Sequence, residues 1–208
     1  MAKRAYSPKE VMAMTYKMIP WGEKWSGPFG NPAINETWFI SGASASGKSS
    51  FVMQLAKELC TYGTTLYLSY EEGVRQSLQE RLLRFKMNEV QGRFRVVTSD
   101  SYEEVIDRLS KPKSAKFVIV DSFQLSKWSY EQVEELVERF RRKSFIFISQ
   151  EHKGQPMGKP AMRLRYLAGV KVRVVGFKAY CQGRFTEDPG TFYPVWKEGI
   201  LRTTNNLK

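Results

Sequence analysis

Cysteine and histidine are scarce in this 208-residue sequence, which has two cysteines and one histidine. Cys60 and Cys181 lie far apart and outside any metal-binding spacing, so we expect both to be reduced and buried. With His152 as the only histidine, a site built from several histidine ligands is excluded.

Long apolar runs are missing as well. No uninterrupted run approaches the roughly 18 residues that a membrane-spanning helix requires. The opening segment MAKRAYSPKEVMAMTYKMIPW is broken by charges and prolines, which does not fit a signal peptide. We therefore expect a cytoplasmic protein without a membrane partner, in the host cytoplasm if the gene is viral.

Acidic residues are few relative to basic ones. The chain has 33 lysines and arginines against 21 aspartates and glutamates, a formal net charge of +12. Such an excess favours a polyanionic partner, with nucleic acid first and an acidic membrane surface second. The plain alternative is a protein that is merely basic.

Apolar β-rich segments alternate with amphipathic helical segments from Thr37 onward, which predicts an α/β fold with a mostly parallel sheet flanked by helices. Residues 1–36, rich in Trp, Pro and Gly, are expected to form an irregular lead-in packed on a single domain of residues 37–208. The last third alternates differently and predicts an antiparallel C-terminal extension. The expected strands are 37–41, 65–70, 93–98, 116–122 and 144–150, and the expected helices are 49–62, 74–87, 102–110 and 129–143.

The segment GASASGKS matches the phosphate-binding loop pattern G-x-x-x-x-G-K-[ST]. It follows an expected strand and begins an expected helix, the context that the pattern requires. Backbone N–H groups would wrap the β-phosphate, Lys48 would contact the β- and γ-phosphates, and the Ser49 hydroxyl would bind Mg²⁺. The expected nucleotide-binding residues are Gly42, Ala43, Ser44, Ala45, Ser46, Gly47, Lys48, Ser49 and Ser50.

Acidic residues follow two of the expected strands. Asp121 ends the apolar segment FVIVD, where a carboxylate can hold a Mg²⁺-bound water. Glu71 and Glu72 follow the second strand, where one carboxylate can orient the water that attacks the γ-phosphate. We assign Glu71 this role and keep Glu72 in reserve. The alternatives are a capped strand end at Asp121 and acids that decorate a helix N-terminus at Glu71.

The order of these motifs resembles the RecA-type P-loop ATPase core, in the form found in DnaB-type helicases and RadA/Sms recombination ATPases. The resemblance covers about residues 37–185 and rests on GASASGKS, LSYEEG, VIVDSFQ and FISQEHK. It implies ATP and Mg²⁺ as cofactors, a ring or filament of identical subunits, Arg81 in the helix after Glu71, and Gln150 as the γ-phosphate sensor. Because the helical, zinc-finger and protease-like domains of those families are not evident, the chain is more similar to minimal phage or prophage RecA-like recombination ATPases.

The segment from Lys153 to Arg184 contains eight basic residues and no acid. Its Gly- and Pro-rich start predicts a mobile loop, and the resemblance implies that this loop holds single-stranded DNA. The DNA-binding candidates are Lys153, Lys159, Arg163 and Arg165. The resemblance also implies that Lys178 and Arg184 contact the nucleotide of a neighbouring subunit. The plain alternatives are a solvated basic loop and two outward-facing strand residues.

Three functions fit these patterns. We favour an ATPase that binds single-stranded DNA in recombination or replication. The second is a small-molecule kinase, in which KPAMRLR would form the lid. The third is an ATPase that switches a protein partner.

Overall fold

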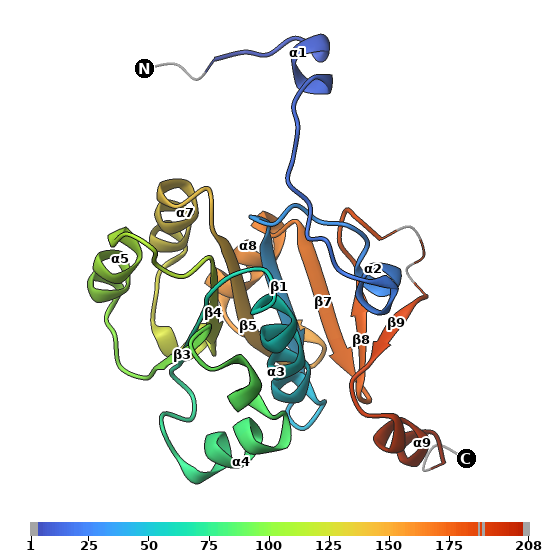
Figure 1. Ribbon diagram of the computed structural model, residues 1–208. Helices are drawn as coiled ribbons and strands as arrows, with labels where there is room; N and C mark the ends of the chain where they lie inside the picture. Colours follow the sequence, from blue (N-terminus) through green and yellow to red (C-terminus); the bar gives the residue numbers. More distant parts are fainter. Residues whose placement is uncertain (1–3, 187, 189, 206–208) are drawn as a thin grey trace.

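The computed structural model describes residues 4–186, 188 and 190–205. Its centre is a nine-stranded sheet in the order β3-β2-β4-β5-β1-β7-β8-β9, with β6 paired to β5 (Figure 1). The strands from β3 to β7 in this order run parallel, whereas β8, β9 and β6 pair antiparallel to their neighbours. The bounds are β1 Thr37–Gly42, β2 Thr65–Ser69, β3 Phe94–Val97, β4 Phe117–Asp121, β5 Ser144–His152, β6 Gln155–Pro156, β7 Val170–Val175, β8 Lys178–Cys181 and β9 Phe192–Pro194.

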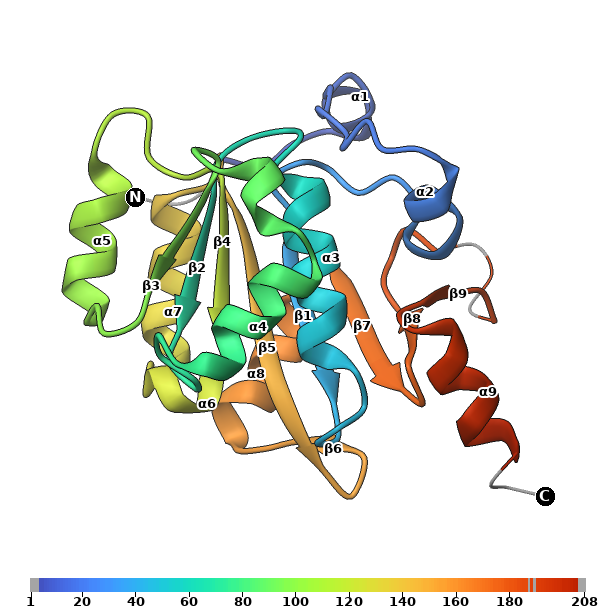
Figure 2. The same cartoon turned by 60° about the horizontal axis from the view of Figure 1, so that its bottom comes forward.

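Helices cover both faces of the sheet. Figure 2 shows α3 and α4 in front of the strands and α7 and α8 behind them. The bounds are α1 Pro8–Met12, α2 Glu23–Phe29, α3 Lys48–Leu59, α4 Gln76–Arg84, α5 Tyr102–Ser110, α6 Phe123–Ser126, α7 Tyr130–Arg139, α8 Lys159–Leu167 and α9 Lys197–Asn205, with a 3₁₀ helix at Met87–Val90. Capping boxes begin α5 at Ser101 and α7 at Ser129.

Two hydrophobic cores lie on opposite faces of the sheet. Trp38 and Ile40 of β1 face the core that includes α3, whereas Phe39 between them faces the core under α5, α7 and α8. Because strand side chains alternate, the central strands are buried on both faces and read as continuous apolar segments. Each large apolar side chain buried in this way contributes about 1.5–3 kcal/mol.

The N-terminal residues divide into two parts. Trp21 and the α2 residues Trp25 and Phe29 are buried, and the Trp25 ring stacks on Tyr193 of β9 with centroids 4.4 Å apart. In contrast, α1 has no buried residue and projects from the body (Figure 1). The segment that we expected to be irregular therefore contains two short helices.

The predicted fold class is confirmed, with three local corrections. Strand β7 pairs parallel with β1, so the antiparallel part begins at β8. The segment 191–202, expected as strand, is strand only at β9, and from Lys197 it forms α9. The segment 153–163, expected as a mobile loop, instead contains β6 and the start of α8, which has Pro160 in its first turn and buries Ala161 and Leu164. Among the described residues, no helix is both long and apolar enough to cross a bilayer.

The two cysteines are free and buried, as expected.

Candidate functional site

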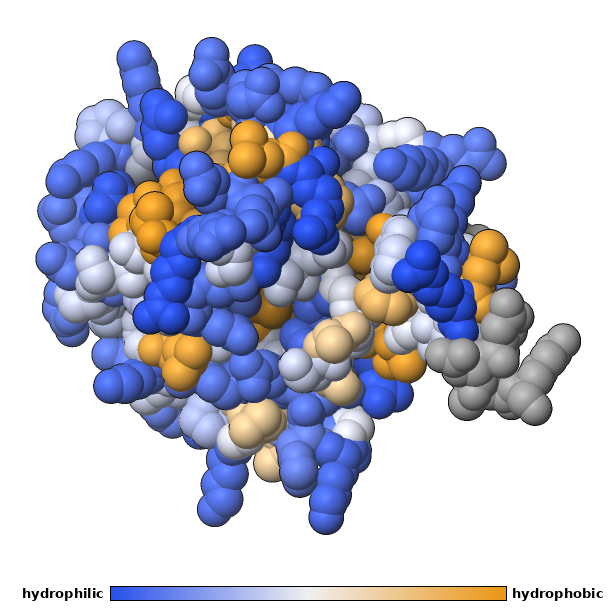
Figure 3. Space-filling model, turned by 90° about the horizontal axis from the view of Figure 1, so that it is seen from below, coloured by the Kyte–Doolittle hydropathy of each residue, from blue (hydrophilic) through white to orange (hydrophobic). Residues whose placement is uncertain are grey.

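The glycine-rich loop lies between β1 and α3, at the edge of the sheet where the parallel strands end. Gly47 adopts φ 98°, which favours glycine, and a Cβ at Gly42 would lie 2.4 Å from the Val174 carbonyl oxygen. The tip of the β7–β8 hairpin supports the loop, because the Phe177 N–H donates to the Ser46 carbonyl at 3.1 Å. Figure 3, viewed from this edge, shows a largely hydrophilic surface with separate hydrophobic patches.

Lys48 folds back over its own loop. Its Nζ donates to the carbonyl oxygens of Gly42 and Ala43 at 2.8 and 2.7 Å. Burial lowers the pKa of Lys48, and the negative charges of Glu71, Asp121 and Glu151 oppose this shift. Three carboxylates from the ends of three strands therefore act on the loop lysine.

Asp121 is the buried final residue of β4. The hydroxyl of buried Tyr67 donates a short hydrogen bond to its Oδ2 atom. Burial raises the pKa of Asp121 to about 6, although the bond from Tyr67 favours the carboxylate. A bound divalent cation would stabilise the ionised form in the same way. Ser49, the other expected metal ligand, lies in the first turn of α3 at the same edge.

Glu71 and Gln150 meet across this edge. The N–H groups of Tyr70 and Glu71 both donate to the Asp121 carbonyl, which turns the chain after β2. Gln150, near the end of β5, then donates through Nε2 to Glu71 Oε1 at 3.1 Å. These are the two residues that the sequence predicted to act at the γ-phosphate. They are 79 positions apart in the chain and are in contact in the fold.

Glu72 has a different environment from Glu71. Its Oε1 atom accepts a 2.6 Å bond from Arg81 of α4, and the two side chains are only 25% and 15% exposed. The Arg81 that the resemblance singled out is therefore an ion-pair partner of Glu72. Glu71 remains exposed and directed toward Gln150.

Glu151, which was not among the predicted site residues, also belongs to the site. Its side chain is 4% exposed, accepts a 2.8 Å bond from Ser41 and forms an ion pair with Arg173 at 3.1 Å. An acid directly after the strand-end glutamine was the available signal. Its partner Arg173 is one of the eight basic residues of segment 153–184, and this ion pair balances its charge in the folded chain.

A cavity of about 530 Å³ opens beside the first turn of α3. Ser50, Arg84, Phe177 and Trp196 contribute to its lining. Phe177 and Trp196 form an edge-to-face pair with centroids 5.0 Å apart, and Trp196 is 41% exposed. An exposed aromatic ring next to the phosphate loop can stack on a planar base. No sequence pattern pointed to Trp196.

Lys178 and Arg184 do not lie together. Lys178 pairs with Val175 at the carboxyl end of β7, and its Nζ lies 4.7 Å from the Phe192 ring centroid. The Arg184 N–H donates to the Gly169 carbonyl, just before β7 begins. Six positions along a strand correspond to about 20 Å. The two residues therefore lie at opposite ends of β7, and their contact with a neighbouring nucleotide stays a prediction.

The four DNA-binding candidates lie on the β5–β6 turn and on α8, and they differ in their partners. Arg163 donates to Glu131 at 2.9 Å and lies 3.8 Å above the Tyr130 ring. Arg165 donates to Gln182 at 3.3 Å. Within the part of the chain that the structure describes, Lys153 and Lys159 have no side-chain hydrogen bond or ion pair. No cluster of three or more His, Cys, Asp or Glu side chains suited to a metal occurs among the described residues.

Comparisons with known proteins agree with a phosphate-loop fold. A family model described as adenylylsulphate kinase matches residues 35–148, more than half of the chain. The chain is similar to a KaiC-like protein of the hyperthermophilic archaeon Pyrococcus horikoshii OT3, with 16% identity, a TM-score of 0.57, and coverage of 80% of this chain and 86% of the other. It is also similar to the flagellar accessory protein FlaH of Methanocaldococcus jannaschii, with 16% identity, a TM-score of 0.57, and coverage of 86% and 92%.

No curated protein matches the chain. At 16% identity the two structures support the RecA-like α/β fold alone, and they say nothing about a helicase, recombinase or phage origin.

Proposed function

Because the chain belongs to the P-loop family described as adenylylsulphate kinase, we propose that it is an enzyme that binds ATP with Mg²⁺ and transfers the γ-phosphoryl group to water. The observation that carries this proposal is the pairing of Glu71 with Gln150 beside Lys48. A carboxylate at that place can accept a proton from a water. A glutamine amide bonded to this carboxylate can sense the γ-phosphate. Residues 37–208 would form the ATPase domain.

The remaining residues have roles that follow from their positions. The loop Gly42–Ser49 would hold the phosphates, and Lys48 would exchange its two loop carbonyl acceptors for phosphate oxygens. Ser49 and Asp121 would hold Mg²⁺ directly or through water, with nucleotide oxygens as further ligands. Trp196 would stack on the base.

The direct test compares ATP binding and phosphate release in the wild type and in Lys48→Ala. We expect Lys48→Ala to abolish nucleotide binding, because the only charged group of the loop is removed. Turnover in Lys48→Ala at the wild-type rate would refute the proposal.

Single-stranded DNA is the partner we propose, in recombination or replication. The net charge of +12 and the unpaired Lys153 and Lys159 support it. The residue after β6 links this segment to the nucleotide site, because the Met157 N–H donates to the Gln150 carbonyl at 3.0 Å. An oligonucleotide titration should raise the ATPase rate, and an unchanged rate would contradict this coupling.

Identical subunits are the other partner we propose, in a ring or filament. The projecting arm, residues 4–18, exposes six large apolar side chains that a neighbouring subunit can cover. They are Tyr6, Val11, Met12, Met14, Tyr16 and Met18. In such an assembly Lys178 would face the neighbouring nucleotide. Mass measurement with a non-hydrolysable ATP analogue tests the assembly.

Phosphoryl transfer to a small molecule is the second candidate, favoured by the family match. ADP formation with and without adenylylsulphate separates the two reactions. A hydrolase forms ADP and phosphate at the same rate in both mixtures, whereas a kinase forms ADP only when the acceptor is present.

A further inference from the structure

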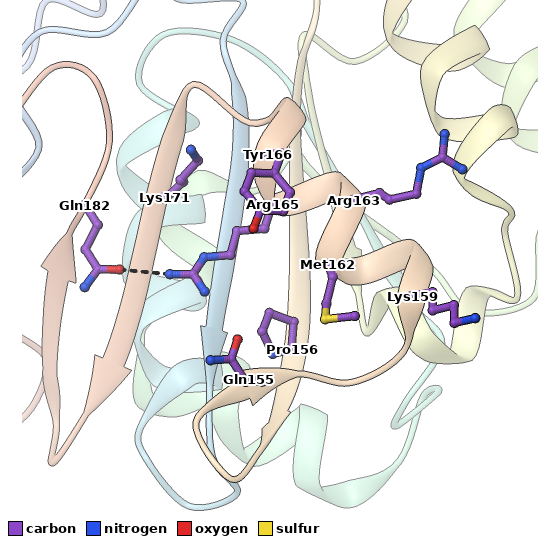
Figure 4. A pocket seen from close by; sticks show the side chains of 9 residues that line it. All are labelled: Gln155, Pro156, Lys159, Met162, Arg163, Arg165, Tyr166, Lys171 and Gln182. Atoms are coloured by element: carbon purple, nitrogen blue, oxygen red, sulfur yellow. Dashed lines mark hydrogen bonds between the residues drawn. The ribbon is translucent and has the colours of Figure 1, made fainter.

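A groove of about 860 Å³ lies between α8 and the strands β7 and β8 (Figure 4). Arg165, Tyr166 and Met162 come from the helix, and Lys171 and Gln182 come from the sheet. No acidic residue lines it. The sequence predicted a mobile loop at 153–163 and strands after it, and it did not predict a groove between a helix and the sheet.

The basic residues of the groove are incompletely neutralised. Lys171 has no side-chain hydrogen bond or ion pair among the residues that the structure places, and Arg165 bonds only the neutral Gln182 amide. In contrast, Arg163 is held by Glu131, and Figure 4 shows Arg163 and Lys159 pointing away from Arg165. Two cations thus face the groove without a carboxylate, an arrangement that suits anionic phosphates.

An exposed aromatic side chain lines the groove beside these cations. Tyr166 is 79% exposed and Met162 is 41% exposed. Tyr166 has no hydrogen bond or ring contact within the described ranges. A ring left this open on a helix of nine residues can stack on a base.

Aromatic side chains continue along the sheet face beside the groove, next to Arg173, whose charge is balanced by Glu151. Arg173 of β7 is paired in register with Tyr180 of β8, which is in turn paired with Phe192 of β9. Directly paired residues share a face, and Lys171 shares it with Arg173 because they are two positions apart. The Tyr180 and Phe192 rings lie 5.5 Å apart.

We propose that this groove binds single-stranded nucleic acid, with Tyr166 stacked on a base and with Lys171 and Arg165 against backbone phosphates. The proposal deepens the nucleic-acid part of the proposed function, on which it rests, and moves the contact from a loop to a helix–sheet groove. Stacking on an isolated ring requires an unpaired base, which disfavours duplex. The arm of a second copy fits poorly, since residues 4–18 carry three basic residues and one acid.

The test measures anisotropy of a labelled oligothymidylate at several salt concentrations, with and without a non-hydrolysable ATP analogue. Tyr166→Ala should weaken binding about 5- to 150-fold, and Tyr166→Phe should retain it because the ring remains. The double variant Arg165→Ala/Lys171→Ala should lower the salt slope by about 1.4, or roughly 0.7 for each lost phosphate contact. Arg95→Ala/Arg142→Ala removes the same charge from exposed positions elsewhere and serves as the control.

Three results would overturn the groove assignment. They are wild-type affinity in Tyr166→Ala, an equal loss in the Arg95/Arg142 control, and duplex bound as tightly as single strand. Competition by a mononucleotide at the same affinity as the oligonucleotide would also overturn it, in favour of a small ligand. ATP binding measured on the wild type keeps the proposals distinct. If the wild type binds the oligonucleotide but not ATP, the ATPase proposal is refuted and the groove is not. If the wild type binds ATP but not the oligonucleotide, the groove and the nucleic-acid partner are refuted and the ATPase is not.

Discussion

Substitutions of the adjacent acids Glu71 and Glu72 should have different effects, one on catalysis and the other on folding stability. We expect Glu71→Gln to retain ATP binding and folding but to lose about 10²- to 10⁴-fold in hydrolysis, because a neutral amide cannot accept the proton of the attacking water. Glu72→Gln should instead retain hydrolysis and lose folding stability. It removes the charge opposite Arg81, whose side chain is only 15% exposed, and Glu72 Oε2 is already buried without a hydrogen-bond partner.

The expected loss in Glu72→Gln follows from the ion pair. Breaking a mostly buried charged hydrogen bond costs about 1–3 kcal/mol in unfolding free energy. For a chain of this length that corresponds to a melting temperature lower by about 2–12 °C. Paired melting curves and phosphate-release assays on both variants give the answer. A normal ATPase in Glu71→Gln with an inactive, fully stable Glu72→Gln would show that the catalytic assignment is off by one residue.

Three other perturbations test separate parts of the structure. Trp196→Ala should raise the Kd for ATP about 2- to 12-fold through lost stacking, while Trp196→Phe should restore most of it; equal affinity in all three proteins would remove the base site from this cavity. Burial raises the pKa of Glu36 above 4.5 in the folded chain. The protonated carboxyl therefore contributes stability at low pH, and this contribution is lost as the pH rises through the raised pKa. Glu36→Gln should therefore become relatively more stable than the wild type as pH rises from 4 to about 7 in urea unfolding, and a constant difference would contradict this. Met12→Ser/Tyr16→Ser should reduce the subunit number found by light scattering with an ATP analogue, and an unchanged mass would show that the arm does not join subunits.

Much of the site could be predicted because its signals are local. The loop GASASGKS can be recognised directly, because two glycines, the lysine and the hydroxyl must stand at a fixed spacing. Asp121 was predictable because it ends an apolar strand, and Glu71 because it follows another. The sequence could not separate Glu71 from Glu72 by position alone. The ion pair of Glu72 with Arg81 favours Glu71 as the carboxylate that is available to water.

Other parts depend on contacts between distant segments. Glu151 was missed because its partners come from other strands: Ser41 lies on the adjacent β1, and Arg173 lies on β7 on the far side of β1. The cavity beside α3 was missed because Trp196 is connected to the phosphate loop through Phe177. The Phe177 ring contacts Trp196, and the Phe177 N–H bonds the loop. The groove was missed because Gly and Pro before Ala161 were read as a loop, although Pro160 occupies the first turn of a helix.

The sequence alone determined the parallel sheet, the phosphate loop and the basic charge, because hydrophobic period, glycine spacing and composition are properties of neighbouring residues. Only the tertiary structure decided which charges remain free. Arg163 and Arg173 are neutralised by acids from other segments, while Arg165 and Lys171 are not. An acid-free segment of sequence therefore becomes, in the folded chain, a surface on which only some cations are available to a ligand.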